Sequence, residues 1–420
     1  MSTMNFVLFG TLILSAVIQF FLVAGFVKCL RRKLQPLLDD VLCPEAMVVL
    51  CLRGGDPFLS NCVRGLLTQD YPNYQVRFLV DHADDPAMPI LKNTLTDIAF
   101  NNYRVEVLAS PLPNCSLKCS SLVQAIEGVP ESIEIIALLD ADTIPHSTWL
   151  RELATALVPM NVGAATGNRW FMPTHCSQGS ITRYAWNAAA IVQMYWYDIA
   201  WGGTLAIKLN SIRRSGLLDR WRNAYCEDTM VRRQLSTIGE KVVFVPTLMM
   251  INREDCTIAS FHSWVKRQLL AARLYHPFWF LVVLHGFSSA SVIVWGLLSS
   301  IWLLVYGDLL GAACVCLALL AFHICLTGML LWMERAVLAI AKARGEDVSW
   351  PGKSNWLTIF WITWQTQWIY TWALLGCLFL KKFDWRGITY SVDGPWEITM
   401  LGYRPYRNER DDHDHSQESI

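Results

Sequence analysis

Four hydrophobic runs without a charged side chain lie near the two ends of the chain. The first covers residues 5–27. Three more follow late in the sequence, at residues 278–306, 309–333 and 356–380. A helix needs about 20 apolar residues to cross the hydrocarbon core of a bilayer, so each run is long enough to span it. The pattern predicts a transmembrane anchor over residues 1–33 and a transmembrane region with a tail over residues 276–420.

A basic cluster directly follows the first run, at Lys28, Arg31, Arg32 and Lys33. The run is too long for the core of a signal peptide, and the charges follow it instead of preceding it, as in a retained anchor. Positive charges collect on the cytosolic side of transmembrane helices. We therefore expect an integral, multi-pass membrane protein whose residues 34–275 lie on the cytosolic face.

The last run is compatible with two placements. If residues 356–380 span the bilayer, the basic residues Lys381 and Lys382 lie outside, against the charge rule; if the run re-enters or lies in the interface, they stay inside. We favour the spanning interpretation. The two glutamines of this run, Gln365 and Gln367, are equally compatible with a helix contact and with a polar path.

Strand and helix patterns alternate within residues 34–275, which contain no comparable hydrophobic run. The predicted strands are residues 46–52, 74–81, 103–110 and 133–140. The predicted helices are residues 54–72, capped by Asp56, 84–100 and 116–129. Continuously apolar strands separated by such helices imply right-handed crossovers and a parallel sheet covered on both faces. The predicted fold class is α/β, in one domain that ends in an interfacial helix before residue 276.

Acidic residues follow two of the predicted strands. Asp81 closes the second strand, with Asp85 just after it, and Asp140 and Asp142 close the fourth. Ligands of such sheets bind outside the carboxyl ends of the strands. Residues two apart on an extended chain point the same way, and two carboxylates about 4 Å apart repel by roughly 4 kcal/mol at a dielectric constant of 20. A divalent cation would remove that cost, which favours a Mg²⁺ or Mn²⁺ site at Asp140 and Asp142 over a solvated turn.

A second acidic pair, Glu227 and Asp228, opens a predicted helix that Gly239 closes. Acids in the first turn of a helix are common for electrostatic reasons, so capping competes with the role of a general base. Downstream, Lys266, Arg267 and Arg273 alternate with apolar residues just before residue 278. This pattern is typical of an interfacial helix with snorkelling cations, and it also permits an arginine turned towards a diphosphate.

The composition supports a membrane protein and argues against several other classes of protein. Hydrophobic residues make up 53% of the chain and charged residues 17%, which agrees with a membrane protein. The formal net charge is zero and no basic tract alternates with aromatic residues, so nucleic-acid binding is not indicated. The cysteines show no paired CxxC spacing, so neither a zinc site nor a disulfide framework is predicted.

Several motifs, taken in order, resemble those of the ceramide glucosyltransferases, membrane-bound GT-A enzymes related to the family-2 glycosyltransferases. They are "LRGGDPFLSNCVRGLLTQDYPNYQVRFLVDHADDPA", "SLKCSSL", the D-x-D region, "CEDTMVRRQLSTIG", "SFHSWVKRQ" and the late "DWRGITY". The resemblance covers most of residues 45–275, with a weaker match at 384–390. It implies a GT-A fold, a UDP-sugar donor and a lipid acceptor.

The resemblance also implies roles for individual residues. Asp85 matches the first conserved acid, Asp140 the second, and Asp142 completes the D-x-D motif. Asp228 matches the catalytic base. The residues expected to contact the sugar nucleotide are Asp81, Asp85, Lys118, Asp140, Arg267 and Gln268.

One motif departs from the family pattern. Arg267 matches the arginine of the Q/R-x-x-R-W motif, but Trp264 stands at the Q/R position and Gln268 stands where the tryptophan should be. In processive polysaccharide synthases that tryptophan packs against the growing sugar. Its absence counts against processivity and leaves the acceptor side of the site open.

We therefore expect an inverting transferase that moves a hexose, glucose by resemblance, from a UDP-sugar to the hydroxyl of a membrane lipid such as ceramide. The aromatic stretch at residues 185–201 is a candidate acceptor wall, although plain core packing is an alternative. Trp385 and Arg386 would close the pocket if the tail is cytosolic.

Two alternatives remain at this point. A processive synthase of the cellulose or hyaluronan type would need a channel through more helices than the sequence predicts. A transporter or an inactive membrane scaffold is a second alternative, but the sequence has no internal repeat of the kind that transporters show.

Overall fold

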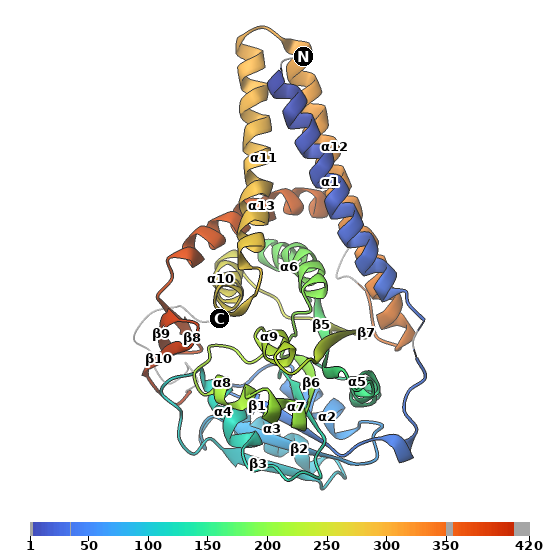
Figure 1. The fold of residues 1–420 in the computed structure, drawn as a ribbon, viewed down its shortest axis with the longest axis vertical. Helices are drawn as coiled ribbons and strands as arrows, with labels where there is room; N and C mark the ends of the chain where they lie inside the picture. Colours follow the sequence, from blue (N-terminus) through green and yellow to red (C-terminus); the bar gives the residue numbers. More distant parts are fainter. Residues whose placement is uncertain (1–2, 34, 350–355, 407–420) are drawn as a thin grey trace.

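The computed structural model describes residues 3–33, 35–349 and 356–406. Three long helices stand side by side as a stalk above a larger body (Figure 1): α1 (Thr3–Leu30), α11 (Trp279–Val305) and α12 (Leu309–Ala343). In the described part of the chain these are the helices long and apolar enough to cross a membrane. The predicted anchor and the first two late spans are therefore present as helices.

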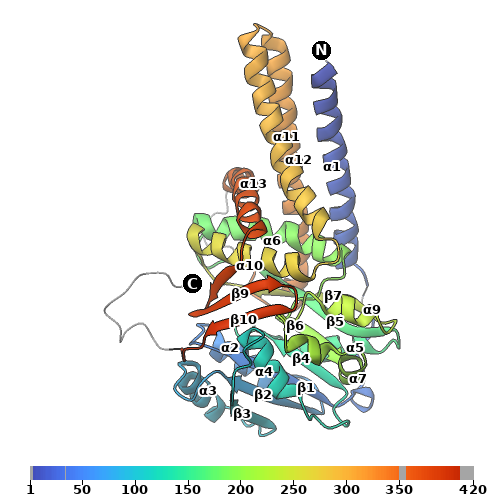
Figure 2. The same ribbon diagram turned by 60° about the vertical axis from the view of Figure 1, so that its left-hand side comes forward.

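The fourth hydrophobic run forms α13 (Trp356–Leu378), but this helix does not join the stalk. It lies across the base of α11 and α12 (Figures 1 and 2). Its length and composition do not place it with the three candidate spans. The structure thus does not support the spanning interpretation of residues 356–380 and agrees with the interfacial alternative. Tryptophan residues recur along α13, and tryptophan favours the membrane–water interface.

The body is built on a seven-stranded mixed sheet of order β3-β2-β1-β4-β6-β5-β7. Its strands are β1 (Ala46–Leu52), β2 (Tyr74–Val80), β3 (Tyr103–Val107), β4 (Ile135–Leu139), β5 (Val162–Phe171), β6 (Thr204–Lys208) and β7 (Lys241–Asn252). The four strands predicted from the sequence, β1 to β4, are mutually parallel. β6 is antiparallel to both β4 and β5, whereas β5 and β7 are parallel. The sheet is therefore mostly parallel, as expected.

Helices cover both faces of this sheet. Its two hydrophobic cores contain, on one side, α2 (Leu59–Leu67), α3 (Ala87–Thr96) and α5 (Trp149–Leu157), and on the other α4 (Leu117–Ile126), α7 (Leu209–Arg214), α8 (Leu217–Trp221), α9 (Val231–Ser236) and α10 (Ile258–Tyr275). Between the sheet and the stalk lie α6 (Gln178–Trp196), α10 and α13 (Figures 1 and 2). The predicted interfacial helix, α10, is thus next to the stalk.

The segment after α13 folds back onto the body, which the sequence analysis did not predict. It forms a small antiparallel sheet of β8 (Lys382–Trp385), β9 (Ile388–Gly394) and β10 (Glu397–Gly402). The backbone N–H of Met400 donates to the carbonyl of Pro113 at 2.8 Å, and the hydroxyl of Tyr390 accepts from the N–H of Leu117 at 3.1 Å. An Asp-Gly pair at Asp393 is a hairpin signal that could have revealed this sheet.

Two helix starts differ from the prediction. Asp56 was expected to cap a helix, but α2 begins at Leu59, and Asp56 Oδ1 accepts from the N–H of Phe58 in the loop before it. Similarly, Glu227 and Asp228 lie in a loop, because α9 begins only at Val231 and its side-chain cap is absent. The interpretation of these acids as caps is therefore wrong, and their side chains are available to the cleft.

Candidate functional site

One continuous cavity of about 2300 Å³ joins the carboxyl edge of the sheet to the base of the stalk. The acids that line it are Asp56, Asp140, Asp142, Glu227, Asp228, Asp255, Glu254 and Asp384. The cations that line it include Arg53, Lys118, Arg169, Arg267 and Arg386. Most of the residues predicted from the sequence to form the site therefore share one hollow.

Lys118 lies between two buried acids at one wall of the cavity. Its Nζ is 2.5 Å from Asp140 Oδ1 and 2.6 Å from Glu227 Oε1. Burial opposes the charge of Lys118, but the two carboxylates attract it and raise its pKa above the ordinary value. For Asp140, burial acts in the opposite sense and the attraction of Lys118 prevails, so its pKa is lowered. Burial raises the pKa of Glu227 to about 7, with Lys118 opposing that rise.

Asp142, unlike Asp140 and Glu227, has no cationic hydrogen-bond partner among the described residues. Asn252 Nδ2 donates to its Oδ2 at 3.1 Å, and the hydroxyl of Thr143 donates to its Oδ1 at 3.3 Å. Burial, and then repulsion by Asp140, raise the pKa of Asp142 to about 6. A carboxylate in this environment, next to a second one, fits a hard divalent cation.

The protein ligands for such an ion are few. No group of three or more His, Cys, Asp or Glu side chains that could hold a metal occurs in the described part of the chain. Asp140 Oδ1 is engaged by Lys118, which leaves its Oδ2 and the oxygens of Asp142. An ion here would need oxygens from a substrate or water to complete its shell, as Mg²⁺ commonly does at phosphate sites.

Asp228 is held in a fixed orientation by its surroundings. Its Oδ2 accepts from the N–H of Gly202 at 2.9 Å, and its Oδ1 accepts from the N–H and the hydroxyl of Thr229 at 2.5 and 3.0 Å. A carboxylate oxygen accepts more than one hydrogen bond, so Oδ2 keeps a lone pair for a substrate proton. The geometry is compatible with the predicted role of general base.

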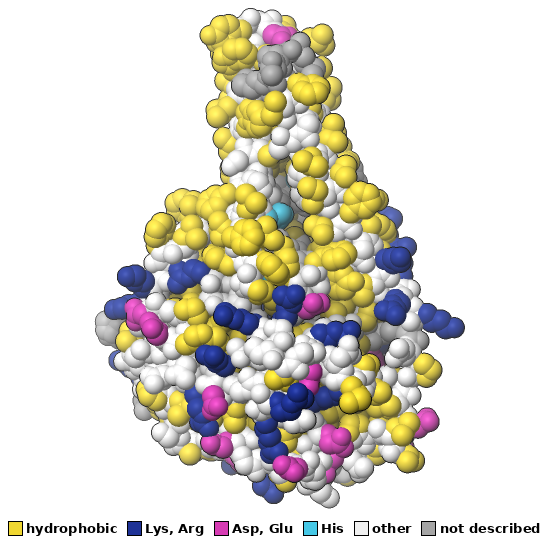
Figure 3. Space-filling view, viewed as in Figure 1, with side chains coloured by type: hydrophobic (Ala, Val, Ile, Leu, Met, Phe, Trp, Pro, Cys, Tyr) yellow, Lys and Arg dark blue, Asp and Glu magenta, His cyan; other side chains and the backbone are white. Residues whose placement is uncertain are grey.

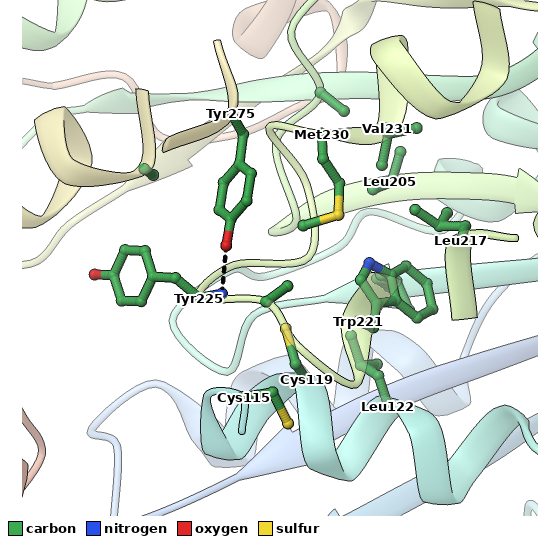
Figure 4. Packing of buried hydrophobic residues seen from close by; sticks show 14 of the residues in the cluster. Cys115, Cys119, Leu122, Leu205, Leu217, Trp221, Tyr225, Met230, Val231 and Tyr275 are labelled. Carbon is green, nitrogen blue, oxygen red and sulfur yellow. Dashed lines mark hydrogen bonds between the residues drawn. The ribbon is translucent and has the colours of Figure 1, made fainter. Parts of the chain in front are cut away.

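A buried cluster behind the cavity supports the loop that carries Glu227 and Asp228 (Figure 4). The N–H of Tyr225 donates to the hydroxyl of Tyr275, at the end of α10, at 2.8 Å. The indole Nε1 of Trp221, which is fully buried, donates to the carbonyl of Glu227 at 2.9 Å. The position of the two acids thus depends on α8 and α10.

Asp81 and Asp85 lie one layer behind the cavity wall. Asp85 is fully buried, and its carboxylate accepts from the backbone N–H groups of Gly54 and Ala87 at 2.8–3.1 Å. Asp81 forms an ion pair with Arg53 and accepts from the hydroxyl of Tyr403 at 3.0 Å. Neither acid lines the cavity, whereas Arg53 and Gly54 do. In this structure their direct effect is to hold the loop after β1 in place, and nucleotide contact stays a prediction.

Arg169 is a site residue that the sequence analysis missed. Its guanidinium lies 4.8 Å from the ring centre of Trp264 and 5.4 Å from that of Trp201, and Nη2 donates to Gln268 Oε1 at 3.5 Å. Burial lowers its pKa, while the charges of Asp142 and Asp140 act the other way. Trp264 and Gln268, the two departures from the family motif, therefore share one partner. A lone arginine within a strand carries no sequence signal that would reveal this.

Two further arginines, Arg267 of α10 and Arg386, line the cavity. Arg267 makes no hydrogen bond or ion pair with a described residue, and burial lowers its pKa. Arg386 lies in the turn between β8 and β9, 3.9 Å from Asp56 Oδ2, and donates to the carbonyl of Arg53. Trp385 also lines the cavity. The prediction that Trp385 and Arg386 close the pocket is thus compatible with the structure, and an unpaired Arg267 is suited to an anion.

The aromatic stretch at residues 185–201 forms the second half of α6 and the loop that follows. Twelve of its residues line the cavity, among them Trp186, Gln193 and Trp201. Trp186 packs edge-on against Trp264 and Tyr370, with ring centres 5.3 and 6.2 Å apart. The stretch therefore serves as a wall and as core packing at once.

The upper part of the cavity is lined by the three helices of the stalk. Its walls there are residues of α1, α11 and α12, including Leu22, Val23, Ile293, Phe322, Leu326, Met329 and Met333. Figure 3 shows hydrophobic side chains covering the stalk and the top of the body, whereas charged side chains gather on the lower body. We name this upper part the apolar branch. It connects the acid cluster to the surface that would face lipid.

Similar solved structures share only a low level of sequence identity. A mannosyltransferase, PcManGT from Pyrobaculum calidifontis, in complex with GDP-Man and Mn²⁺, is 14% identical over 89% of this chain and 99% of that chain, with a TM-score of 0.47. Glucosyl-3-phosphoglycerate synthase from Mycobacterium tuberculosis, with Mn²⁺, UDP-Glc and glycerol 3-phosphate, is 10% identical over 57% and 86%, with a TM-score of 0.36. GalNAc-T7 with UDP, GalNAc and Mn²⁺ is 10% identical over 60% and 53%, with a TM-score of 0.41.

None of the curated proteins compared with this chain matches it. A family model, in contrast, matches residues 11–395, which include most of α1, all of α11 and α12, the whole seven-stranded sheet and the Trp385–Arg386 turn. That family is described as glycosyl transferase family 21. The mostly parallel sheet with an antiparallel strand agrees with the GT-A fold expected from the motifs. The chain therefore belongs to glycosyl transferase family 21 and is a glycosyltransferase.

Proposed function

We propose that this glycosyltransferase moves a hexose, glucose by family resemblance, from a UDP-sugar to the hydroxyl of a membrane lipid such as ceramide, with inversion at the anomeric carbon. One observation carries the proposal. The cavity that contains Asp140, Asp142 and Asp228 continues without interruption into the apolar branch between α1, α11 and α12. A lipid could thus keep its chains between the membrane helices while its hydroxyl reaches the acids.

Asp228 acts as the general base in this proposal. One of its oxygens removes the proton of the acceptor hydroxyl while the hydroxyl oxygen forms a bond to the anomeric carbon. The bond from that carbon to the diphosphate oxygen breaks in the same step, so the configuration inverts. The hydrogen bonds from Gly202 and Thr229 hold the carboxylate in orientation during this displacement.

The departing diphosphate needs positive charge, and the structure offers it from several elements. Arg267 faces the cavity without a hydrogen-bonding or ionic partner among the described residues, Lys118 lies beside Asp140, and Arg386 lines the same cavity near Asp56. Asp142, with the remaining oxygen of Asp140, would hold Mg²⁺ or Mn²⁺. A bound ion of this kind supplies further charge for the leaving group.

The membrane placement also remains a proposal. We infer that the body, residues 34–275, faces the cytosol. Lys28 lies in the last turn of α1 and Arg31 and Arg32 follow it at the base of the stalk, where Lys342 and Arg344 end α12. A cytosolic body would meet the UDP-sugar pool directly. Epitope tags placed at each end of the stalk, with protease added before and after membrane permeabilisation, test the orientation.

Radiolabelled UDP-glucose incubated with membranes that contain the chain tests the function. The proposal expects label in a lipid that partitions into organic solvent. Asp228→Asn should reduce that label by about 10²–10⁴-fold, the range for loss of a general base. Asp97→Asn is the matched control, because Asp97 is an exposed acid paired with Arg64 away from the cavity. Label in a high polymer would instead favour a polysaccharide synthase. Unchanged labelling in Asp228→Asn would show that Asp228 is not the general base.

A further inference from the structure

The chain after β10 returns to the cavity. We name residues 403–406 the tail strap. Arg404, Pro405 and Tyr406 of this segment line the cavity together with residues 53–58, the loop that follows β1. We propose that the tail strap completes the donor site and that the ring of Tyr406 stacks on the base of the bound nucleotide. This inference rests on the proposed function, because it assumes a nucleotide-sugar donor.

Arg53, the first residue after β1, holds the tail strap in place. Its Nη2 donates to the carbonyl of Arg404 at 2.9 Å, and its Nε donates to the carbonyl of Arg386, in the β8–β9 turn, at 3.0 Å. Its Nη1 forms the ion pair with Asp81, which directly follows β2. A guanidinium offers five N–H donors in a fixed planar fork, so one side chain can join several segments. Arg53 therefore ties the ends of β1 and β2 to two segments of the C-terminal region.

The start of the tail strap is anchored to the hydrophobic core. Ile388 and Tyr390 of β9 are fully buried in the core that also contains residues of α4 and α10. The hydroxyl of Tyr403 donates to Asp81 Oδ1 at 3.0 Å. The two residues that follow Tyr403 are exposed, so they have no such anchor. The hydrogen bond from Arg53 therefore fixes this part of the strap at the cavity.

The ring of Tyr406 lies face-on against Gly54. A Cβ atom on Gly54 would lie 2.9–3.2 Å from Cζ and the two Cε atoms of the ring. These three carbons are almost equally far from that position, and the hydroxyl oxygen is farther, so Gly54 lies over the face of the ring. The guanidinium carbon of Arg53 is 5.5 Å from the ring centre. Gly54 is itself fixed, because its N–H donates to the carboxylate of Asp85 at 2.9 and 3.1 Å. The ring is therefore a supported aromatic surface at the cavity.

The order of the strands places the base of a nucleotide near the tail strap. Three neighbouring strands follow the order β2-β1-β4, and ligands of such sheets bind outside the carboxyl ends of the strands. The strap contacts residues at the ends of β2 and β1, whereas Asp140 and Asp142 follow β4. Adjacent strands lie about 4.8 Å apart, so strap and acids are separated by roughly 5–10 Å. This separation suits a nucleotide with its diphosphate at the acids and its base at Tyr406.

Two other aromatic residues line the cavity near the loop after β1, and their contacts differ from those of Tyr406. Phe58 directly precedes α2, at the other end of that loop. Trp385 packs beside Tyr225, with ring centres 6.3 Å apart, and Tyr225 lies in the segment that leads to Asp228. Tyr406, by contrast, lies against the two residues directly after β1. Its ring is therefore the surface that we assign to the base.

Binding of UDP to the full chain in detergent micelles, measured by calorimetry with Mg²⁺ in excess, tests the inference without the transfer reaction. Tyr406→Ala should weaken UDP binding by about tenfold, within the range for loss of a base–aromatic stack. Binding of inorganic pyrophosphate, which has the diphosphate but no base, should not change. Tyr406→Phe keeps the ring and should keep the affinity of the wild-type protein for UDP.

Variants of Arg53 test its positioning role. Arg53→Lys keeps a positive charge for Asp81, but a single ammonium group does not reproduce the planar fork that reaches two carbonyls as well. We expect UDP binding about fivefold weaker, the effect of one lost hydrogen bond. In the double variant with Tyr406→Ala, Arg53→Lys should add little, because both changes act through the same surface. Fully additive losses would contradict a role of Arg53 through the strap.

Two comparison variants complete the design. Tyr306→Ala is the matched control, because Tyr306 is 72% exposed at the end of α11 and does not line the cavity. It should leave the binding of both ligands unchanged. Phe58→Ala should keep the difference between UDP and pyrophosphate. If Phe58→Ala abolishes that difference while Tyr406→Ala keeps it, the assignment of Tyr406 is overturned.

The inference and the proposed function fail in different ways. Equal affinity for UDP in the wild-type protein and Tyr406→Ala, or an equal loss for pyrophosphate, overturns the stacking role while lipid glycosylation stands. Tighter UDP binding in Tyr406→Ala also overturns it, since the ring would then occupy the place of the base. If UDP binding follows the expected pattern but no lipid is labelled, the proposed acceptor is wrong and the assignment of the strap stands. If the wild-type protein binds no UDP, both are overturned.

Discussion

The backbone N–H of Gly202 donates to Asp228 Oδ2 at 2.9 Å, and neighbouring side chains leave no space for a Cβ atom on Gly202. A Cβ there would lie 1.8 Å from Glu227 Oε1 and 3.3 Å from Lys118 Nζ. One glycine thus lets the proposed base Asp228, the buried acid Glu227 and Lys118 approach each other. The loop after α6 and the loop before α9 meet at this residue.

Gly202→Ala should therefore displace Glu227 and Asp228 together. We expect activity to fall by about 10²-fold or more, since a shift of about 1 Å at a reacting group has that effect. Initial rates with radiolabelled UDP-glucose check this. Gly328→Ala in α12 is the control, because a Cβ there meets nothing within 4 Å. Comparable losses in both variants would show that the effect does not arise at the site.

Lys118→Met should destabilise the body by about 3–5 kcal/mol, because it leaves Asp140 and Glu227 buried without their shared cation. The double variant Lys118→Met with Glu227→Gln should recover part of this loss, since one uncompensated charge is removed. Thermal unfolding in detergent micelles measures both. Additive losses in the double variant would mean that the two residues are not coupled.

Stability should depend on pH through Glu227. Burial raises its pKa to about 7 in the folded protein from an ordinary value of 4.5, so the folded state binds the proton more tightly than the unfolded state. Stability must then fall as pH rises from about 4.5 to about 7 and be unaffected by this group outside that window. The amide of Glu227→Gln has no proton to lose in this range. The stability of this variant relative to the wild-type protein should therefore increase as pH rises from about 4.5 to about 7.

Melting temperatures of the two proteins, without metal or donor, at intervals from pH 4.5 to 8 check this dependence. The difference should reach a plateau above pH 7, with an upper limit of about 3 kcal/mol from the pKa change. A difference that is constant over the whole range would contradict a raised pKa for Glu227.

Arg386 combines a rare backbone conformation with a charge at the cavity. Its φ is +47°, in the left-handed region, and Gly387 follows with +75°. Arg386→Gly should therefore relax the turn and keep or slightly raise stability, while removing the cation near Asp56. We expect a KM for UDP-glucose about tenfold higher with little change in melting temperature. Arg404→Gly, outside the turn, is expected to lack the stability benefit.

The sequence pattern anticipated much of the architecture but not all of it. The strands β1 to β4 were predicted from short, largely apolar runs bounded by turn residues, although Arg77 interrupts β2 and Arg104 and Glu106 interrupt β3. The direction of β6, which lies antiparallel between β4 and β5, could not be predicted, since periodicity records burial and not orientation. Likewise the length and apolar character of α13 favoured a span, whereas its position across the stalk base depends on packing against α6, α10 and α11.

For the site, the sequence by itself determined which acids follow the carboxyl end of β4 and which precede α9, because the local apolar pattern ends at those residues. It also determined that helices of membrane length flank the body. Only the tertiary structure decided that Lys118 bridges Asp140 and Glu227, that Arg169 contacts both Trp264 and Gln268, and that Asp81 and Asp85 lie behind the wall. These relations join residues from separate elements, and no local pattern specifies which side chains the packing of a whole fold brings within a few ångströms.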